Sequence, residues 1–222
     1  MNTISFLIEL VLPYLAVIIF IISLVIRIKN WASMPHNLKW SLYPMPVTYK
    51  EQIKFMLKEI LSFKSVFHNN RRLWIGGWIF HIGMALIVLW FLSFLIGLHT
   101  GIILRIGLLI LFVLPIYILI VRIANKQMRA ISSPIEYFNL SIFIIIAALG
   151  FSVIKNPFMH PDVVRQYFIG ILLFHPVTFT ASPSFLWLLA MVEFFLIYFP
   201  NSKMLHMVSK YFAFHKVNWE SH

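Results

Sequence analysis

The stretch that decides the fold is residues 73–97, LWIGGWIFHIGMALIVLWFLSFLIG. It carries no charged residue, and His81 and Ser93 are its only polar side chains apart from the tryptophans. A helix of this length rises about 37 Å, which exceeds the roughly 30 Å hydrocarbon core of a bilayer. The stretch therefore predicts a membrane-spanning helix that holds an imidazole inside the membrane.

Composition extends this prediction to the whole chain. Of the 222 residues 61% are hydrophobic and only 11% are charged, against about 25% charged in a typical soluble domain. Four more apolar runs are long enough to span, which gives the predicted set 4–26, 73–97, 102–121, 135–154 and 185–204. We expect an all-α integral membrane bundle of five transmembrane helices that forms one domain over residues 1–222.

The basic residues predict how this bundle lies in the membrane. All but three of the 18 lysines and arginines fall on one side of the predicted spans, and the exceptions are Arg105, Lys155 and Arg165. By the positive-inside rule the amino terminus is outside and the carboxyl terminus is cytoplasmic, in the inner (cytoplasmic) membrane. The first run begins without a basic cluster and no small-residue cleavage site follows it, so we expect a retained helix. The net charge of +11 reflects topology and lipid contact, and no nucleic-acid partner is expected.

Two polar segments are predicted on the cytoplasmic side. The loop 30–72 contains an amphipathic helix, in which Ile53, Met56, Leu57 and Ile60 recur at helical spacing opposite lysines and glutamates. This helix is expected to lie on the membrane or to dock against a partner. The second segment is the tail 205–222. A shorter apolar run at 167–174 predicts an interfacial helix before the last span.

Histidine is the residue type on which a metal site here must rest. The chain has no cysteine, so disulfides, iron–sulfur clusters and thiolate zinc sites within it are excluded. His81 lies about two turns into the second span and His206 at the end of the fifth, and both are predicted near the cytoplasmic face. Imidazoles from two helices can hold one haem iron between them. Arg122, Arg71 and Arg72 are candidate partners for the haem propionates.

Around these histidines the sequence resembles a known family. FHIG at 80–83 and FPNSKMLH at 199–206 resemble the cytochrome b (gamma) subunit of respiratory nitrate reductase. The tail VSKYFAFHKVNW at 208–219 is more similar to the gamma-like membrane cytochromes of sulfite-reduction-associated and heterodisulfide-reductase-like complexes. The resemblance implies haem b held by His81 and His206, exchange of electrons with menaquinone or another quinone, and a cytoplasmic iron–sulfur subunit. Further membrane subunits are possible partners.

The sequence departs from that family at the second haem. The positions of the family's outer haem ligands carry Phe91 and Leu188, and neither side chain can bind iron. His99 and His175 lie at the outer ends of the same two spans and are the alternative pair. If they do not bind a haem, they are histidines of surface loops. One haem b is therefore expected and a second is possible.

The predicted function is electron transfer between the membrane quinone pool and a cytoplasmic iron–sulfur subunit of a respiratory complex. The chain would be a subunit of a quinol-linked oxidoreductase and would not be catalytic alone. The alternative is a haem-free membrane anchor or transporter subunit. Acidic residues in or near the spans are functional candidates. Of these, Glu193 either carries protons or bonds a quinone, or pairs with a polar group, and Glu9 favours packing or pairing.

Overall fold

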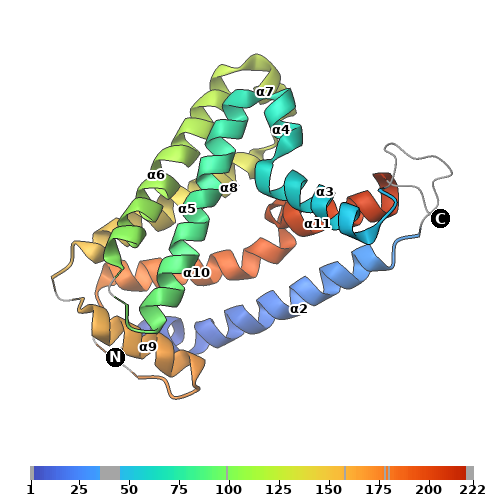
Figure 1. Ribbon diagram of the computed structural model, residues 1–222. Helices are drawn as coiled ribbons and strands as arrows, with labels where there is room; N and C mark the ends of the chain where they lie inside the picture. The colour runs from blue at the N-terminus through green and yellow to red at the C-terminus, as the bar shows by residue number, and fades with distance from the viewer. Residues whose placement is uncertain are drawn as a thin grey trace. The chain divides into compact units, whose positions relative to one another are not determined.

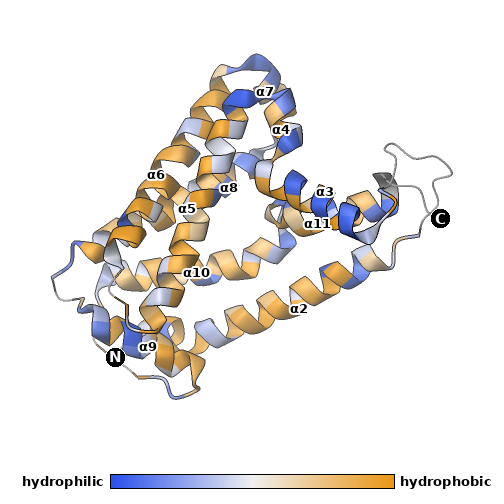
Figure 2. Ribbon diagram, viewed as in Figure 1, coloured by the Kyte–Doolittle hydropathy of each residue, from blue (hydrophilic) through white to orange (hydrophobic). Residues whose placement is uncertain are grey.

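The protein is all-helical in the part of the chain that its computed structural model describes, residues 3–35, 46–98, 100–157, 159–177, 179 and 181–218. Five segments of that part are long and apolar enough to cross a membrane: Thr3–Ala32, Arg71–Leu95, Gly101–Ala124, Pro134–Ile154 and Pro183–Asn201. Figure 2 shows apolar residues along these helices and hydrophilic residues on the shorter α3 (Tyr49–Ser62), α4 (Lys64–Asn69) and α7 (Lys126–Ile131). The predicted all-α fold with five spans is confirmed.

The first span contains a wide turn that its sequence explains. It is built from α1 (Thr3–Phe6), the π-helical turn η1 (Leu7–Val11) and α2 (Leu12–Ala32). Pro13 has no N–H, so it cannot donate the usual hydrogen bond to the carbonyl of Glu9 four residues earlier. The N–H of Leu12 instead reaches back five residues to the carbonyl of Leu7. The helix thus continues through the proline, and it ends six residues beyond the predicted boundary.

The chain divides into two compact units, and each is described by itself. The first consists of Met1–Ala16 and Arg72–Phe195, and the second of Val17–Arg71 and Leu196–His222. The first unit contains α6 (Gly101–Ala124), α7 (Lys126–Ile131), α8 (Pro134–Ile154), α9 (Pro161–Leu172) and most of α5 (Arg71–Leu95) and α10 (Pro183–Tyr198). The predicted interfacial helix at 167–174 is thus part of α9, which begins earlier.

Glycines set the close packing of the first unit, in which α5 and α6 lie side by side (Figure 1). A Cβ on Gly107 of α6 would lie 2.7 Å from Ile87 of α5. A Cβ on Gly150 of α8 would lie 2.9 Å from Leu108 of α6. Small residues let membrane helices approach this closely. In lipid the hydrophobic effect does not drive helices together, so the dispersion contacts of this close packing hold them.

The turn between α5 and α6 is held from α9. Gly97 has a φ of +87°, which glycine adopts without steric cost, and it follows the end of α5. Arg165 Nε of α9 donates a hydrogen bond to the carbonyl of Leu95, 3.1 Å away. This contact places a positive charge at the carboxyl end of the α5 dipole and satisfies one of its terminal carbonyls.

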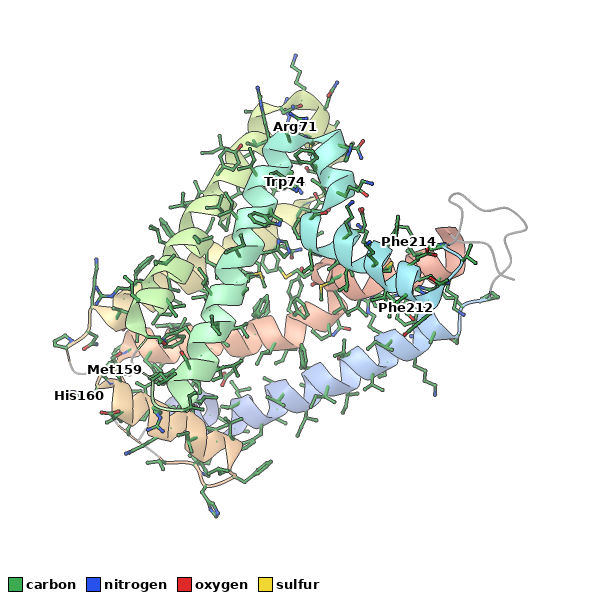
Figure 3. The ribbon with its side chains drawn as sticks, in the orientation of Figure 1. Arg71, Trp74, Met159, His160, Phe212 and Phe214 are labelled. Carbon is green, nitrogen blue, oxygen red and sulfur yellow. The ribbon has the colours of Figure 1, made fainter. Side chains whose placement is uncertain are left out.

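The second unit places the amphipathic helix against the carboxyl-terminal segment. Thr48 and Glu51 form a capping box that starts α3 (Tyr49–Ser62), and α4 (Lys64–Asn69) follows. The residues for which an amphipathic helix was predicted are helical in the structure. The buried Met56 of α3 packs with Phe214 of η4 (Phe214–Asn218), which is labelled in Figure 3. Lys210 Nζ donates to Glu59 Oε1 over 2.8 Å from α11 (His206–Ala213). Part of the helix surface thus contacts the chain's own tail.

The fifth span ends earlier than predicted. Its helix α10 stops at Tyr198, and the 3₁₀ turn η2 (Phe199–Asn201) completes the span. Ser202 is extended (φ −100°, ψ 173°), and its hydroxyl accepts from the N–H of Met204 in the next 3₁₀ turn, η3 (Lys203–Leu205). The helix α11 then begins at His206. The prediction that His206 closes the fifth span is therefore wrong, because Ser202 caps a new turn instead of continuing the helix.

Candidate functional site

The second span holds His81 with a defined tautomer. Its Nδ1 lies 2.7 Å from the carbonyl oxygen of Gly77, one turn earlier on α5. A carbonyl only accepts, so Nδ1 carries the proton, and in a neutral imidazole the lone pair lies on Nε2. The Phe80 ring stands edge-on to the His81 ring at 5.4 Å and packs in turn on Phe143 of α8. The backbone and the aromatic neighbour together orient a half-buried imidazole that can act as a metal ligand.

The three glycines near His81 do two different things. A Cβ on Gly76 would lie 3.0 Å from Ile118, and one on Gly83 would lie 2.4 Å from Ile110, so both glycines serve the contact with α6. Gly77 is different, because no neighbouring group of the described residues, its own helix backbone apart, lies within 4 Å of the place where its Cβ would be. The open side of α5 is thus next to the carbonyl that orients His81. This side of α5 is less crowded than the side that faces α6.

His206 is the first residue of α11 and its side chain is exposed. The helix presents it beside the short turns that follow the fifth span, where the carbonyl of His206 also accepts from the Ser209 hydroxyl at 3.1 Å. His206 belongs to the second unit and His81 to the first. An exposed imidazole on a short surface helix is accessible to a ligand, which is what a pairing with haem requires.

The three arginines predicted to meet haem propionates have distinct surroundings. Arg122, in the last turn of α6, donates from Nη1 to the Ser132 hydroxyl at 2.7 Å and also contacts the Glu136 carboxylate. Its Nε is buried and has no hydrogen-bond partner within the described residues. The guanidinium of Arg71 lies over the Phe67 ring at 5.0 Å. Arg72 is exposed, and its backbone carbonyl accepts a hydrogen bond from the hydroxyl of Tyr117 at 3.4 Å.

The possible second pair is only partly described. His99 lies outside the described residues. His175 follows α9, where its backbone N–H donates to the Gly170 carbonyl at 2.8 Å and its side chain is exposed. At the position of the family's outer ligand, the Phe91 ring packs edge-on against Phe168 of α9 at 5.2 Å. An aromatic contact between α5 and α9 therefore stands where that ligand would be.

Two buried carboxyl groups lie deeper in the first unit. Glu9 is 2% exposed and Glu193 is 3% exposed. Both act electrostatically on the Tyr167 hydroxyl, which donates to the backbone carbonyl of Glu9 at 2.8 Å. Burial, followed by the charges of Glu193 and Glu9, raises the pKa of Tyr167 above its usual value. Sequence reasoning had singled out both glutamates but had no signal that Tyr167 of α9 joins them.

Within the described residues no three histidine or acidic side chains gather as metal ligands. A haem does not require such a cluster, because its porphyrin supplies four ligands and the protein supplies only the axial ones. The Nε2 lone pair of His81 and the open side of α5 at Gly77 fit that demand.

Comparison with known proteins identifies one relative. The chain is 25% identical to the Hdr-like menaquinol oxidoreductase cytochrome b-like subunit of Archaeoglobus fulgidus, over 91% of this chain and 76% of that protein. No protein-family model matches the chain, and no solved structure matches it. The similarity connects the chain to a membrane cytochrome b-like protein along nearly its whole length.

Proposed function

We propose that this chain is a haem b-containing membrane subunit that transfers electrons between the membrane quinone pool and a cytoplasmic iron–sulfur subunit of a respiratory complex. The observation that carries the proposal is the His81 imidazole, whose Nδ1 is held by the Gly77 carbonyl beside an open side of the helix. The name of the archaeal relative, a cytochrome b-like subunit of a menaquinol oxidoreductase, supports it.

In this proposal His81 and His206 would hold the haem iron, each through a ring nitrogen. Arg71, Arg72 and Arg122 are the candidate partners for the propionates, and the unsatisfied buried Nε of Arg122 favours that residue. When bound, haem b would supply one-electron redox chemistry. A second haem on His99 and His175 belongs to the proposal only as an additional possibility.

The remaining parts of the proposal concern partners and location. Menaquinone is the favoured quinone because the relative's name specifies it. The resemblance to the nitrate reductase gamma subunit favours an iron–sulfur partner on the cytoplasmic side. The basic loop and tail favour a location of this chain in the inner membrane with its amino terminus outside. The chain acts as one subunit of a quinol-linked oxidoreductase and needs the others for turnover.

Substitution of each ligand tests the proposal. We expect H81A and H206A to insert into the membrane and to lose the low-spin b-type absorption bands of the wild-type protein. H160A is the matched control, because His160 is an exposed histidine ahead of α9. It should keep the wild-type spectrum. Wild-type spectra in both H81A and H206A would rule out these ligands, and a wild-type protein without b-type bands would favour the haem-free anchor or transporter subunit.

A further inference from the structure

We propose that Glu193 and Glu9 form a buried proton-accepting site that takes up the hydroxyl protons of a quinol. The inference rests on the quinone-linked function proposed above, and it adds the residues that receive the protons. It concerns only the first unit, which contains both glutamates and Tyr167.

Both glutamates are positioned by one aromatic cluster. Leu189, one turn before Glu193 on α10, packs with Tyr167 and Phe185 in the buried cluster of the first unit. Ile8, the residue before Glu9, packs against the same cluster. Residues next to the two glutamates thus pack on Tyr167 from different spans, and the charges of both glutamates act on its hydroxyl.

Sequence and backbone explain why Glu9 is held here. Pro13 cannot donate to the Glu9 carbonyl, and the hydroxyl of Tyr167 does so over 2.8 Å. The chain forms its π-helical turn at this point, between Leu7 and Val11. Such turns frequently accompany functional sites. Tyr167 is therefore a positioning residue that fixes the wide turn bearing the Glu9 side chain.

Within the described residues, the Glu193 carboxyl group lacks the hydrogen-bond partners that a structural role would provide, and one oxygen of Glu9 does so too. Both carboxylate oxygens of Glu193, and Oε2 of Glu9, are buried without a hydrogen-bond partner in the described part of the chain. The charged form of such a group is costly in apolar surroundings, so taking up a proton is favourable. The positive charge of the amino terminus acts on Glu9. Among the described residues no ion pair to Glu193 is found, and Arg165, which lies on the same helix as Tyr167, bonds to the carbonyl of Leu95. Proton uptake is the reaction for which these groups are suited.

Two carboxylates can accept the two protons that a quinol releases when it is oxidised. A quinol loses two hydroxyl protons and two electrons as it becomes a quinone. Each O–H bond of the quinol breaks as a new O–H bond forms on one carboxylate, Glu193 or Glu9. The electrons leave one at a time to the iron-centred one-electron acceptors of the complex. Both carboxyl groups then release their protons before the next quinol reacts.

Infrared difference spectroscopy reads the protons directly. The purified protein is compared with and without a water-soluble menaquinol analogue, in H₂O and in D₂O. We expect the wild type to show a quinol-induced carboxylic acid C=O band that shifts in D₂O and that weakens in both E193Q and E9Q. D162N is the matched control, because Asp162 is an exposed acid on the same helix as Tyr167, and it should keep the band. An unchanged band in both glutamate variants would overturn the proposal.

Stopped-flow reduction gives an independent test in the assembled complex. Reduction by the quinol analogue should slow about a hundredfold in E193Q, the lower part of the range for a positioned proton acceptor, while dithionite reduces the same absorbing centre fully. E193D retains a carboxyl group, so its rate of reduction should lie between those of E193Q and the wild type. This variant keeps the proposal testable if E193Q assembles poorly. Wild-type rates in E193Q and E9Q would refute the site. Failure of the proposed function itself would appear differently, as a wild-type protein without b-type bands.

Discussion

His81 shows how one residue of a membrane helix acquires a defined chemical role. The carbonyl of Gly77 fixes the proton on Nδ1, and the absence of a side chain on Gly77 leaves the helix surface beside it open. Gly83, two residues after the histidine, faces α6 instead and carries the packing of the pair. The two glycines therefore differ in function although the sequence gives them the same residue type.

Substitution by alanine distinguishes these two glycines. In G83A the new Cβ would lie 2.4 Å from Ile110 Cγ2 and 2.8 Å from Ile110 Cβ, and a Cβ cannot rotate away. We expect the free energy of unfolding to fall by about 1–3 kcal/mol, the usual cost of overpacking. The matched G77A adds a methyl group in open space and should leave the protein as stable as the wild type or more so. Thermal unfolding in detergent measures both, and equal melting temperatures would contradict this packing.

The residue scale also shows what sequence alone could predict. An imidazole within residues 73–97 was evident from the sequence, because an apolar run of this length must span the membrane. The orientation of the ring and the open side at Gly77 were not, because they depend on which side of α5 meets α6. The joining of Tyr167 to Glu9 was equally hidden, since the two residues are 158 positions apart.

At the scale of elements, α3 and α11 are joined by a partly buried ion pair. Lys210 Nζ lies 2.8 Å from Glu59 Oε1, and the Ser65 N–H also donates to this carboxylate, over 3.1 Å. Burial raises the pKa of Glu59, but the hydrogen bonds from Lys210 and Ser65 and the charge of Lys210 outweigh it, so the pKa falls below its usual value. The folded state thus favours the carboxylate.

This ion pair predicts a pH-dependent contact. Because the pKa of Glu59 in the folded state lies below the ordinary value of 4.5, the stabilisation is fully present above pH 4.5 and is lost as the pH falls through the lowered folded value. Hydrogen–deuterium exchange of residues 206–213 should therefore accelerate in acid, beyond the intrinsic pH dependence. In E59Q that extra acceleration should be absent, and K210A should exchange faster than wild type at neutral pH. The control K58A removes an exposed lysine of α3 and should exchange like the wild type. Unaltered exchange in K210A would show that the pair does not hold the segment.

Element boundaries were predictable where local chemistry sets them. The start of α3 follows from Thr48 and Glu51, whose capping box is a local pattern. The end of the fifth span was misplaced by sequence reasoning, because the predicted span was drawn to Met204 across the polar stretch 200–203, while the helix ends at Tyr198. The hydroxyl of Ser202, which accepts from the Met204 N–H, determines that boundary. The packing of Met56 on Phe214 could not be foreseen, because it joins segments far apart in the chain.

At the scale of the whole molecule, the asymmetry of basic residues predicts one orientation in the membrane. The chain contains no cysteine, so single introduced cysteines can be labelled without background. Gln127 in α7 and Gln166 in α9 are both exposed and lie on opposite predicted sides. A membrane-impermeant maleimide should label Q166C in intact spheroplasts and Q127C only after permeabilisation. The reverse pattern would place the amino terminus in the cytoplasm.

The central claim is that this protein binds haem b. A reduced-minus-oxidised difference spectrum of the purified wild-type chain, combined with a pyridine haemochrome assay, tests it most directly. The account predicts b-type bands and one haem per chain, or two if His99 and His175 also bind one. A protein purified from haem-sufficient cells that shows no b-type bands would contradict the account.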